Sequence, residues 1–143
     1  MDLTGKIITD HERLGEIVAA YRTLGKRIVT TIGSWDLLHI GHVRYLNRAK
    51  QEGNILVVGV DSDRAIRLYK KTGLRPIVPQ DERCEMLSYQ SCVDYVIVVD
   101  DVTEEGAWEF KLLDVTNPDV FIAVHDSYPK EQLREIEKRC GTV

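Results

Sequence analysis

The segment RIVTTIGSWDLLHIGHVRYLNRAK, residues 27–50, decides the fold. Its first seven residues are rich in β-branched side chains and end in glycine, which is typical of a buried strand. Farther along, Val43, Leu46 and Ala49 lie three positions apart, the spacing of one face of a helix. The segment therefore predicts a strand over 27–33, a short turn, and a helix that opens at residues 39–42 and ends at Gly53.

The same alternation continues on both sides of this unit. Apolar runs predict three further strands, and helical spacing predicts helices between them; the strands are 55–60, 95–99 and 120–124, and the helices are 14–24, 80–92, 108–115 and 133–140. The stretch up to Lys71 is a polar helix or a loop, and 141–143 begins a fifth strand. Such alternation indicates an α/β fold with a doubly wound parallel sheet. We expect one domain, because domains commonly contain about 100–150 residues.

The bulk properties exclude several classes of function. The formal net charge of −4 gives no general attraction to nucleic acid or to an anionic membrane. The three cysteines lack the spacing of a metal site, and their odd number argues against a disulfide framework. No apolar run approaches about 18 residues, and the first residues lack the apolar stretch of a signal peptide. We therefore expect a cytoplasmic protein with no nucleic-acid or membrane partner.

The turn after the first strand suits a nucleoside triphosphate. In doubly wound sheets, ligands bind outside the carboxyl ends of the strands, and a helix N-terminus there offers unpaired N–H groups and partial positive charge. Gly33 and Gly41 have no side chains, so a nucleotide can approach the backbone closely. His39 and His42 lie on the same side of a helical turn. Their imidazoles can donate hydrogen bonds to phosphate oxygens as negative charge develops in a transition state.

Two histidines at this spacing are not specific to phosphate binding. They could bind a metal, but no Cys or Glu completes the three protein ligands of a catalytic zinc site, so we predict no protein metal site. An HxxH pair is also often only a solvated helix end. A redox protein on a dinucleotide-binding fold is excluded because the first turn lacks GxGxxG. Asp61 and Asp63 follow the second strand, where capping of the next helix accounts for them.

Residues 31–50, TIGSWDLLHIGHVRYLNRAK, resemble the HxGH nucleotidyltransferase superfamily, and specifically its cytidylyltransferase-like branch. LVVGVDSDRAIRLYK and RPIVPQDERCEMLSYQSCVDYVIVVDD extend the resemblance. Within the branch, the sequence is most similar to the adenylyltransferase domains that act on heptose 1-phosphate in lipopolysaccharide core synthesis. The resemblance implies a Rossmann-like fold and transfer of an adenylyl group from ATP to a phosphate-bearing acceptor, with release of pyrophosphate. FAD synthetase and glycerol-3-phosphate cytidylyltransferase, which uses CTP, are the alternatives.

The resemblance also implies roles for individual residues. His39 and His42 contact the triphosphate, Lys70 or Lys71 reaches phosphates, and Arg83 lies at the mouth of the acceptor site. Asp36 lies beside the nucleotide and the acceptor. The expected catalytic residues are His39, His42, Lys71 and Arg83, and the expected nucleotide-binding residues are Ile32, Gly33, Ser34, Trp35, Asp36, His39, Gly41, His42, His125 and Asp126.

Some of these residues also suit purely structural roles. The lysines suit a solvated surface, Arg83 can pair with Asp81 or Glu85 at a helix start, and Trp35 suits packing better than substrate contact. The loop after the fourth strand departs from the family, because Val124-His125 stand where relatives have a glycine before the aspartate. Bulk at that point could crowd the base or change the base preference.

The resemblance further implies a homodimer and Mg²⁺, held mainly by the nucleotide and water. Relatives carry an Arg and a Ser/Thr-rich motif after the fifth strand, which binds the phosphates at a helix N-terminus. The sequence ends at Val143, so we expect the domain 1–143 to lack this motif. That expectation leaves a second class of function open: a nucleotide-binding protein with little catalysis.

Overall fold

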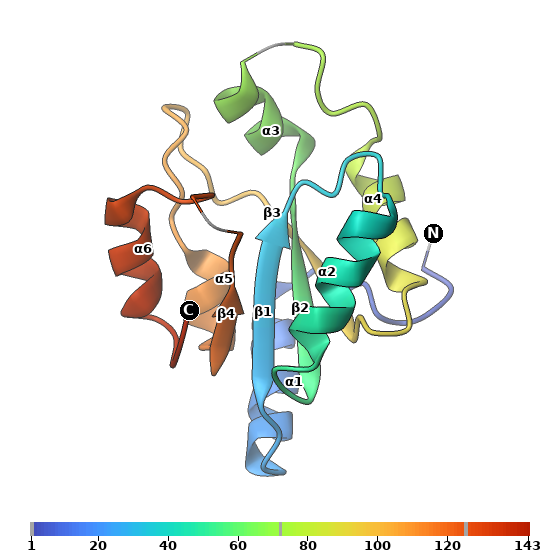
Figure 1. Cartoon of the computed structure of the whole chain (residues 1–143), viewed down its shortest axis with the longest axis vertical. Coiled ribbons are helices and arrows are strands. Elements are labelled where there is room, and N and C mark those ends of the chain that lie inside the picture. The colour runs from blue at the N-terminus through green and yellow to red at the C-terminus, as the bar shows by residue number, and fades with distance from the viewer. Residues whose placement is uncertain (1, 72, 125) are drawn as a thin grey trace.

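The computed structural model describes residues 2–71, 73–124 and 126–143. Within these residues, four strands form one parallel sheet in the order β3-β2-β1-β4 (Figure 1). The strands are β1 (Ile28–Gly33), β2 (Ile55–Asp61), β3 (Tyr95–Val99) and β4 (Val120–Ile122). The predicted fold class, a single-domain α/β protein with a doubly wound parallel sheet, is confirmed.

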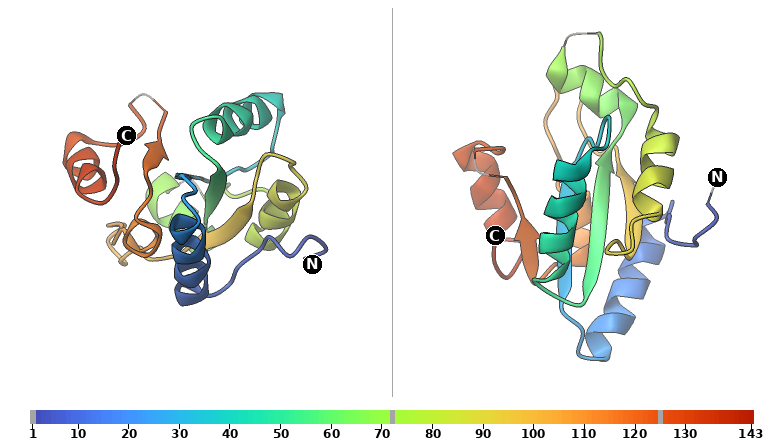
Figure 2. Two further views of the ribbon diagram at one scale, coloured as in Figure 1. Left: turned by 90° about the horizontal axis from the view of Figure 1, so that it is seen from below. Right: turned by 45° about the vertical axis from the view of Figure 1, so that its right-hand side comes forward.

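Helices cover both faces of this sheet. On one face lie α2 (Ile40–Lys50) and α4 (Gln80–Ser88), and on the other lie α1 (His11–Thr23) and α5 (Lys111–Thr116) (Figure 2). Beyond β4, α6 (Lys130–Glu137) packs Ile136 against Phe121 and Leu113. The remaining helix, α3 (Asp63–Lys70), lies past the carboxyl ends of the strands (Figure 1).

The central strand β2 shows why the sheet is covered on both sides. Residues 55–60 are all buried, as expected for an apolar run in a parallel sheet. Gly59 sits where α5 comes closest, and a Cβ there would lie 2.8 Å from the Leu112 side chain. Glycine at this position therefore lets α5 pack directly on the sheet.

Several element boundaries differ from those predicted. The helix α4 ends at Ser88 rather than near Cys92, and α5 begins at Lys111, so that Trp108 precedes it. The stretch left open as helix or loop is α3, and its cap is Ser62, whose Oγ accepts from Ala65 N–H at 3.0 Å. Neither of the flanking aspartates that we had assigned to capping does this, so that prediction is wrong.

The last residues run beside β4. Thr142 forms a parallel bridge with Val120, and its carbonyl accepts a hydrogen bond from Phe121 N–H at 2.8 Å. This placement agrees with the predicted start of a fifth strand. Among the described residues, no helix has the length and apolar character needed to cross a membrane.

Candidate active site

A cavity of about 740 Å³ opens where the predicted nucleotide site should lie. Its volume falls within the roughly 300–1,000 Å³ of small-molecule sites. The lining residues come from the end of β1 and the turn after it, α2, the end of β2, α3, the loop before α5, the segment after β4 and α6. They are Ile32, Gly33, Ser34, Trp35, His39, Gly41, His42, Tyr45, Asp61, Tyr69, Lys70, Val102, Gly106, Trp108, Ala123, Val124, Ser127, Tyr128 and Gln132. Most of the nucleotide-binding residues expected from the turn after β1 are therefore brought together.

The two histidines form the start of α2. His39 is the N-cap, and its Nδ1 accepts a hydrogen bond from Gly41 N–H at 3.1 Å. In return, His42 Nδ1 accepts from His39 N–H at 3.2 Å, and the two rings stack with centroids 3.9 Å apart. A neutral imidazole that accepts at Nδ1 carries its proton on Nε2. Each ring therefore keeps one N–H donor that its backbone contacts do not use.

The charge state of His42 favours this arrangement. Burial lowers the pKa of His42, and the neighbouring His39 lowers it further. A neutral ring preserves the Nδ1 acceptor on which the cap depends. The pair thus presents Nε2–H donors at a helix N-terminus, where partial positive charge already attracts anions.

Gly41 allows the His39 ring to lie against the backbone. A Cβ at position 41 would lie 2.8 Å from His39 Cε1 and 3.0 Å from its Nδ1, closer than real contacts permit. The glycine in HxGH is therefore needed for the ring position as well as for close approach of a ligand.

Trp35 holds the turn after β1 in place through its buried side chain. Its side chain is 6% exposed, and its indole N–H donates to the Gly59 carbonyl at 3.0 Å. The same ring meets His42 edge-on at 5.7 Å between centroids. Trp35 therefore packs in the core, as we expected, and it also supports one of the histidines.

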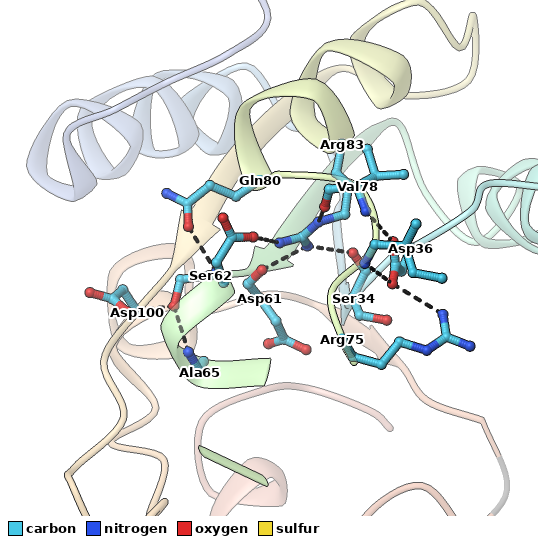
Figure 3. Close-up of polar contacts among 12 residues, drawn as sticks. Ser34, Asp36, Asp61, Ser62, Ala65, Arg75, Val78, Gln80, Arg83 and Asp100 are labelled. Atoms are coloured by element: carbon cyan, nitrogen blue, oxygen red, sulfur yellow. Dashed lines mark hydrogen bonds and ion pairs between the residues drawn. The ribbon is translucent and has the colours of Figure 1, made fainter. Parts of the chain in front are cut away.

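Asp36 lies beside the cavity without lining it. Its carboxylate accepts from Ile77 N–H and Val78 N–H, both at 2.9 Å, and from Arg75 at 3.1 Å. Burial opposes its ionisation, but these hydrogen bonds outweigh burial and lower the pKa of Asp36. Asp36 therefore ties the segment before α4 to the turn after β1 (Figure 3). Its expected contact with the nucleotide stays a prediction.

Arg83 is also turned inward. The side chain is 1% exposed and donates to the carbonyls of Val78, Ser34 and Asp61 at 2.6–2.8 Å. Its second terminal nitrogen pairs with Asp63 at 2.7 Å (Figure 3). The pairing that we expected with Asp81 or Glu85 is not the one formed, because α4 points Arg83 at the ends of β1 and β2. Arg83 does not line the main cavity, and its catalytic role remains untested.

The remaining expected residues divide between the cavity and its surroundings. Lys70 lines the cavity, whereas Lys71 caps the end of α3 with a φ of 53° and is not among the lining residues. Asp126, with a φ of 63°, is not among them either. His125 lies outside the described residues, so its expected contact with the nucleotide stays a prediction.

Sequence reasoning missed the opposite wall of the cavity. Asp61 ends β2, and Tyr69 of α3 donates its hydroxyl hydrogen bond to the Asp61 carboxylate. Burial raises the pKa of Asp61, against the effect of Tyr69, Arg83 and Lys70. Its place directly after a buried strand, at the same sheet edge as Gly33, is the signal that could have revealed it.

Aromatic residues complete that wall. Tyr128 lines the cavity, and burial raises the pKa of its hydroxyl. Trp108 also lines the cavity, and its buried indole nitrogen has no hydrogen-bond partner among the described residues. The described residues include no group of three His, Cys, Asp or Glu side chains that could hold a metal ion.

Comparison with known proteins agrees with this geometry. Residues 30–143 match the family model described as Cytidylyltransferase-like. The chain therefore belongs to the cytidylyltransferase-like family, and the predicted class, a nucleotidyltransferase, is confirmed.

Individual relatives extend the comparison. The chain is 39% identical over 119 residues to the bifunctional protein HldE of Syntrophotalea carbinolica, covering 83% of this chain and 23% of that protein. It is 38% identical over 135 residues to HldE of Geotalea uraniireducens, covering 94% and 26%. The chain thus spans about a quarter of the length of these relatives. A lipopolysaccharide core biosynthesis protein from Thermoplasma volcanium has a similar structure, with a TM-score of 0.66 at 27% identity over 83% of this chain and 97% of that one.

Proposed function

We propose that this chain transfers an adenylyl group from ATP to a phosphate-bearing acceptor, with heptose 1-phosphate as the first candidate, and releases pyrophosphate. The observation that carries the proposal is the histidine pair at the start of α2. Both Nδ1 atoms are used by backbone N–H groups, so both Nε2–H groups remain available in a cavity of nucleotide size.

The proposed reaction needs no nucleophilic side chain. A phosphate oxygen of the acceptor attacks the α-phosphorus of ATP in line, a new P–O bond forms, and the bond from the α-phosphorus to the β-phosphate oxygen breaks. Pyrophosphate leaves with the bonding electrons. The protein contributes positioning and donors aimed at the developing charge, which is how phosphoryl transfer is generally catalysed.

Mg²⁺ would neutralise charge on the phosphates when bound with ATP. Asp61 is the one carboxylate among the described lining residues, so these residues offer no set of carboxylates that could enclose the ion. We therefore propose that the phosphates and water hold the ion, as is usual for Mg²⁺. Lys70, in the same lining, adds a positive charge on the α3 side.

The names of similar proteins support the choice of acceptor. The similar sequences are those of bifunctional HldE proteins, and the similar structure is that of a lipopolysaccharide core biosynthesis protein. The resemblance to heptose enzymes favours adenine as the base. By the same resemblance we propose a homodimer, which light scattering of the purified chain would test. We also propose a cytoplasmic location, because Cys84, Cys92 and Cys140 are free thiols, as is usual in a reducing compartment.

A pyrophosphate-release assay tests the proposed reaction. The chain is incubated with Mg²⁺ and ATP or CTP, and heptose 1-phosphate, glycerol 3-phosphate or FMN is supplied as acceptor. We expect the fastest release with ATP and heptose 1-phosphate, and none without an acceptor. CTP with glycerol 3-phosphate as the best pair would move the reaction to a cytidylyltransferase, and FMN as the best acceptor would make it an FAD synthetase. ATP binding with no release for any acceptor would instead indicate a nucleotide-binding protein.

A further inference from the structure

Asp61 lies on the side of the cavity away from β4. In the sheet order β3-β2-β1-β4, β2 and β4 flank β1 on opposite sides, which places the switch point between β1 and β4. Nucleotides bind at such switch points in doubly wound sheets. Ala123 and Val124, after β4, line that side of the cavity, whereas Asp61 lines it from the end of β2. Asp61 therefore faces the half of the cavity that a nucleotide at the switch point leaves to the acceptor.

Asp61 is held at two points, its carboxylate and its backbone carbonyl. The Tyr69 hydroxyl donates to Oδ2, and Arg83 Nη1 donates to the Asp61 backbone carbonyl at 2.8 Å. In Figure 3, Asp61 projects from this carbonyl contact away from Arg83. No side chain or backbone group of the described residues donates to Oδ1. One acceptor atom of an oriented carboxylate thus remains for a ligand.

The charge of this carboxylate limits which ligand group can meet it. A phosphate would face a like charge at close range, which is unfavourable in a partly buried site. A hydroxyl group is neutral and donates one hydrogen bond, which is what an unpaired carboxylate oxygen requires. The phosphates already have the His39 and His42 donors elsewhere in the same cavity.

We propose that Asp61 binds a hydroxyl group of the acceptor and so selects acceptors that carry a hydroxyl group at that place. Tyr69 is a positioning residue that orients the carboxylate. The inference rests on the proposed nucleotidyl transfer and adds that the acceptor is hydroxylated, as a sugar or polyol phosphate is.

Steady-state kinetics with the acceptor that releases pyrophosphate fastest tests this assignment. Loss of a hydrogen bond to a charged group lowers affinity roughly ten- to a hundredfold. We expect Asp61→Ala to lower kcat/KM for the acceptor by about this factor, with the KM for ATP unchanged, and Asp61→Asn, which keeps the shape, to lose less. An acceptor analogue that lacks the hydroxyl bound by Asp61 should have an equally low kcat/KM with the native chain. Asp61→Ala should lower the kcat/KM for this analogue little further, because both changes remove the same hydrogen bond.

Tyr69 gives an independent readout. Tyr69→Phe keeps the ring and removes the hydroxyl, so we expect a higher KM for the acceptor with kcat nearly unchanged. Tyr89, the C-cap of α4, and Glu85 of that helix provide the matched control, because they form the same kind of pair at 2.7 Å outside the main cavity. Tyr89→Phe should leave both constants unchanged. A fall in kcat alone for Tyr69→Phe would contradict the positioning role.

The possible outcomes separate the inference from the proposed function. If the native chain releases no pyrophosphate with any acceptor, the proposed function fails and the inference fails with it. If the native chain is active and Asp61→Ala leaves acceptor kinetics unchanged, only the inference is wrong. If Asp61→Ala raises the KM for ATP but not the KM for 2′,3′-dideoxy-ATP, Asp61 binds a hydroxyl group of the ribose. A higher Mg²⁺ requirement would make it a metal ligand. Either of these results overturns the acceptor assignment.

Discussion

Two clusters of polar side chains lie at the carboxyl edge of the sheet and use their hydrogen bonds in opposite ways. In the HxGH turn, His39 and His42 each bond the backbone through Nδ1 and keep Nε2–H for the cavity. In the neighbouring cluster, Arg83 donates to three carbonyls and to Asp63 and does not reach the cavity. Location at this edge therefore does not by itself make a residue functional. A residue becomes functional when it keeps a hydrogen-bond donor that its contacts within the protein do not use.

The largest expected effect concerns Arg83 and the groups to which it donates hydrogen bonds. Arg83→Ala leaves Asp63 and three carbonyls without their donor, and breaking such a buried pair costs about 3–5 kcal/mol. For a domain of this size we expect the melting temperature to fall by roughly 10 °C or more. Thermal unfolding followed by circular dichroism measures this, with the exposed Arg48→Ala on α2 as control. A variant that melts at the same temperature as the native chain but releases no pyrophosphate would indicate that Arg83 takes part in the reaction.

The next effect concerns the outward-facing pair. Loss of one preorganised donor lowers kcat by about 10²–10³, so we expect this loss in pyrophosphate release for His42→Ala. Folding should weaken by only about 1 kcal/mol, because the change also removes one capping hydrogen bond. Urea unfolding of the same samples provides the comparison. Unchanged release would remove His42 from the catalytic residues.

A smaller change sharpens the same contrast. In Gly41→Ala, the new Cβ would lie 2.8 Å from His39 Cε1, so the ring must shift. Misplacement by about 1 Å can cost as much as a hundredfold in rate, and we expect at least a tenfold loss. Stability should change little, because the roughly 1 kcal/mol by which alanine favours helix over glycine is offset by the loss of the His39 capping hydrogen bond. Gly15→Ala, in α1 and outside the cavity lining, is the control and should keep full activity.

The smallest expected effect is a dependence of stability on pH. Burial and His39 lower the pKa of His42, so above the ordinary histidine pKa of about 6.5 the ring is neutral in both folded and unfolded chains. As pH falls below that value, the unfolded chain takes up the proton first, and the folded state loses stability. Burial also lowers the pKa of His11, so the native chain must be compared with His42→Gln. We expect a shallower decline for the variant between pH 7 and 5. Equal slopes would contradict a neutral His42.

The sequence predicted the HxGH turn well because its parts are local. A β-branched run, a glycine and a helix start within 16 residues define the strand, the turn and the positions of His39 and His42. The contacts of Arg83 and Asp36 could not be predicted in this way. Arg83 meets Asp63 across 20 positions, and Asp36 meets Val78 across 42, so both depend on tertiary packing. Asp61 was attributed to capping, yet Ser62 caps α3 and leaves the carboxylate in the cavity.

The most direct test of the central claim is a measurement of the histidine tautomers. The chain contains four histidines, so nitrogen-15 correlation spectra of the imidazoles can be assigned by substitution. We predict that His39 and His42 carry a proton on Nε2 and none on Nδ1, as their Nδ1 hydrogen bonds require, and that ATP with Mg²⁺ shifts these two Nε2 signals most. Protons on Nδ1, or ATP binding that leaves both Nε2 signals in place, would contradict the claim that this turn presents its ring donors to a nucleotide.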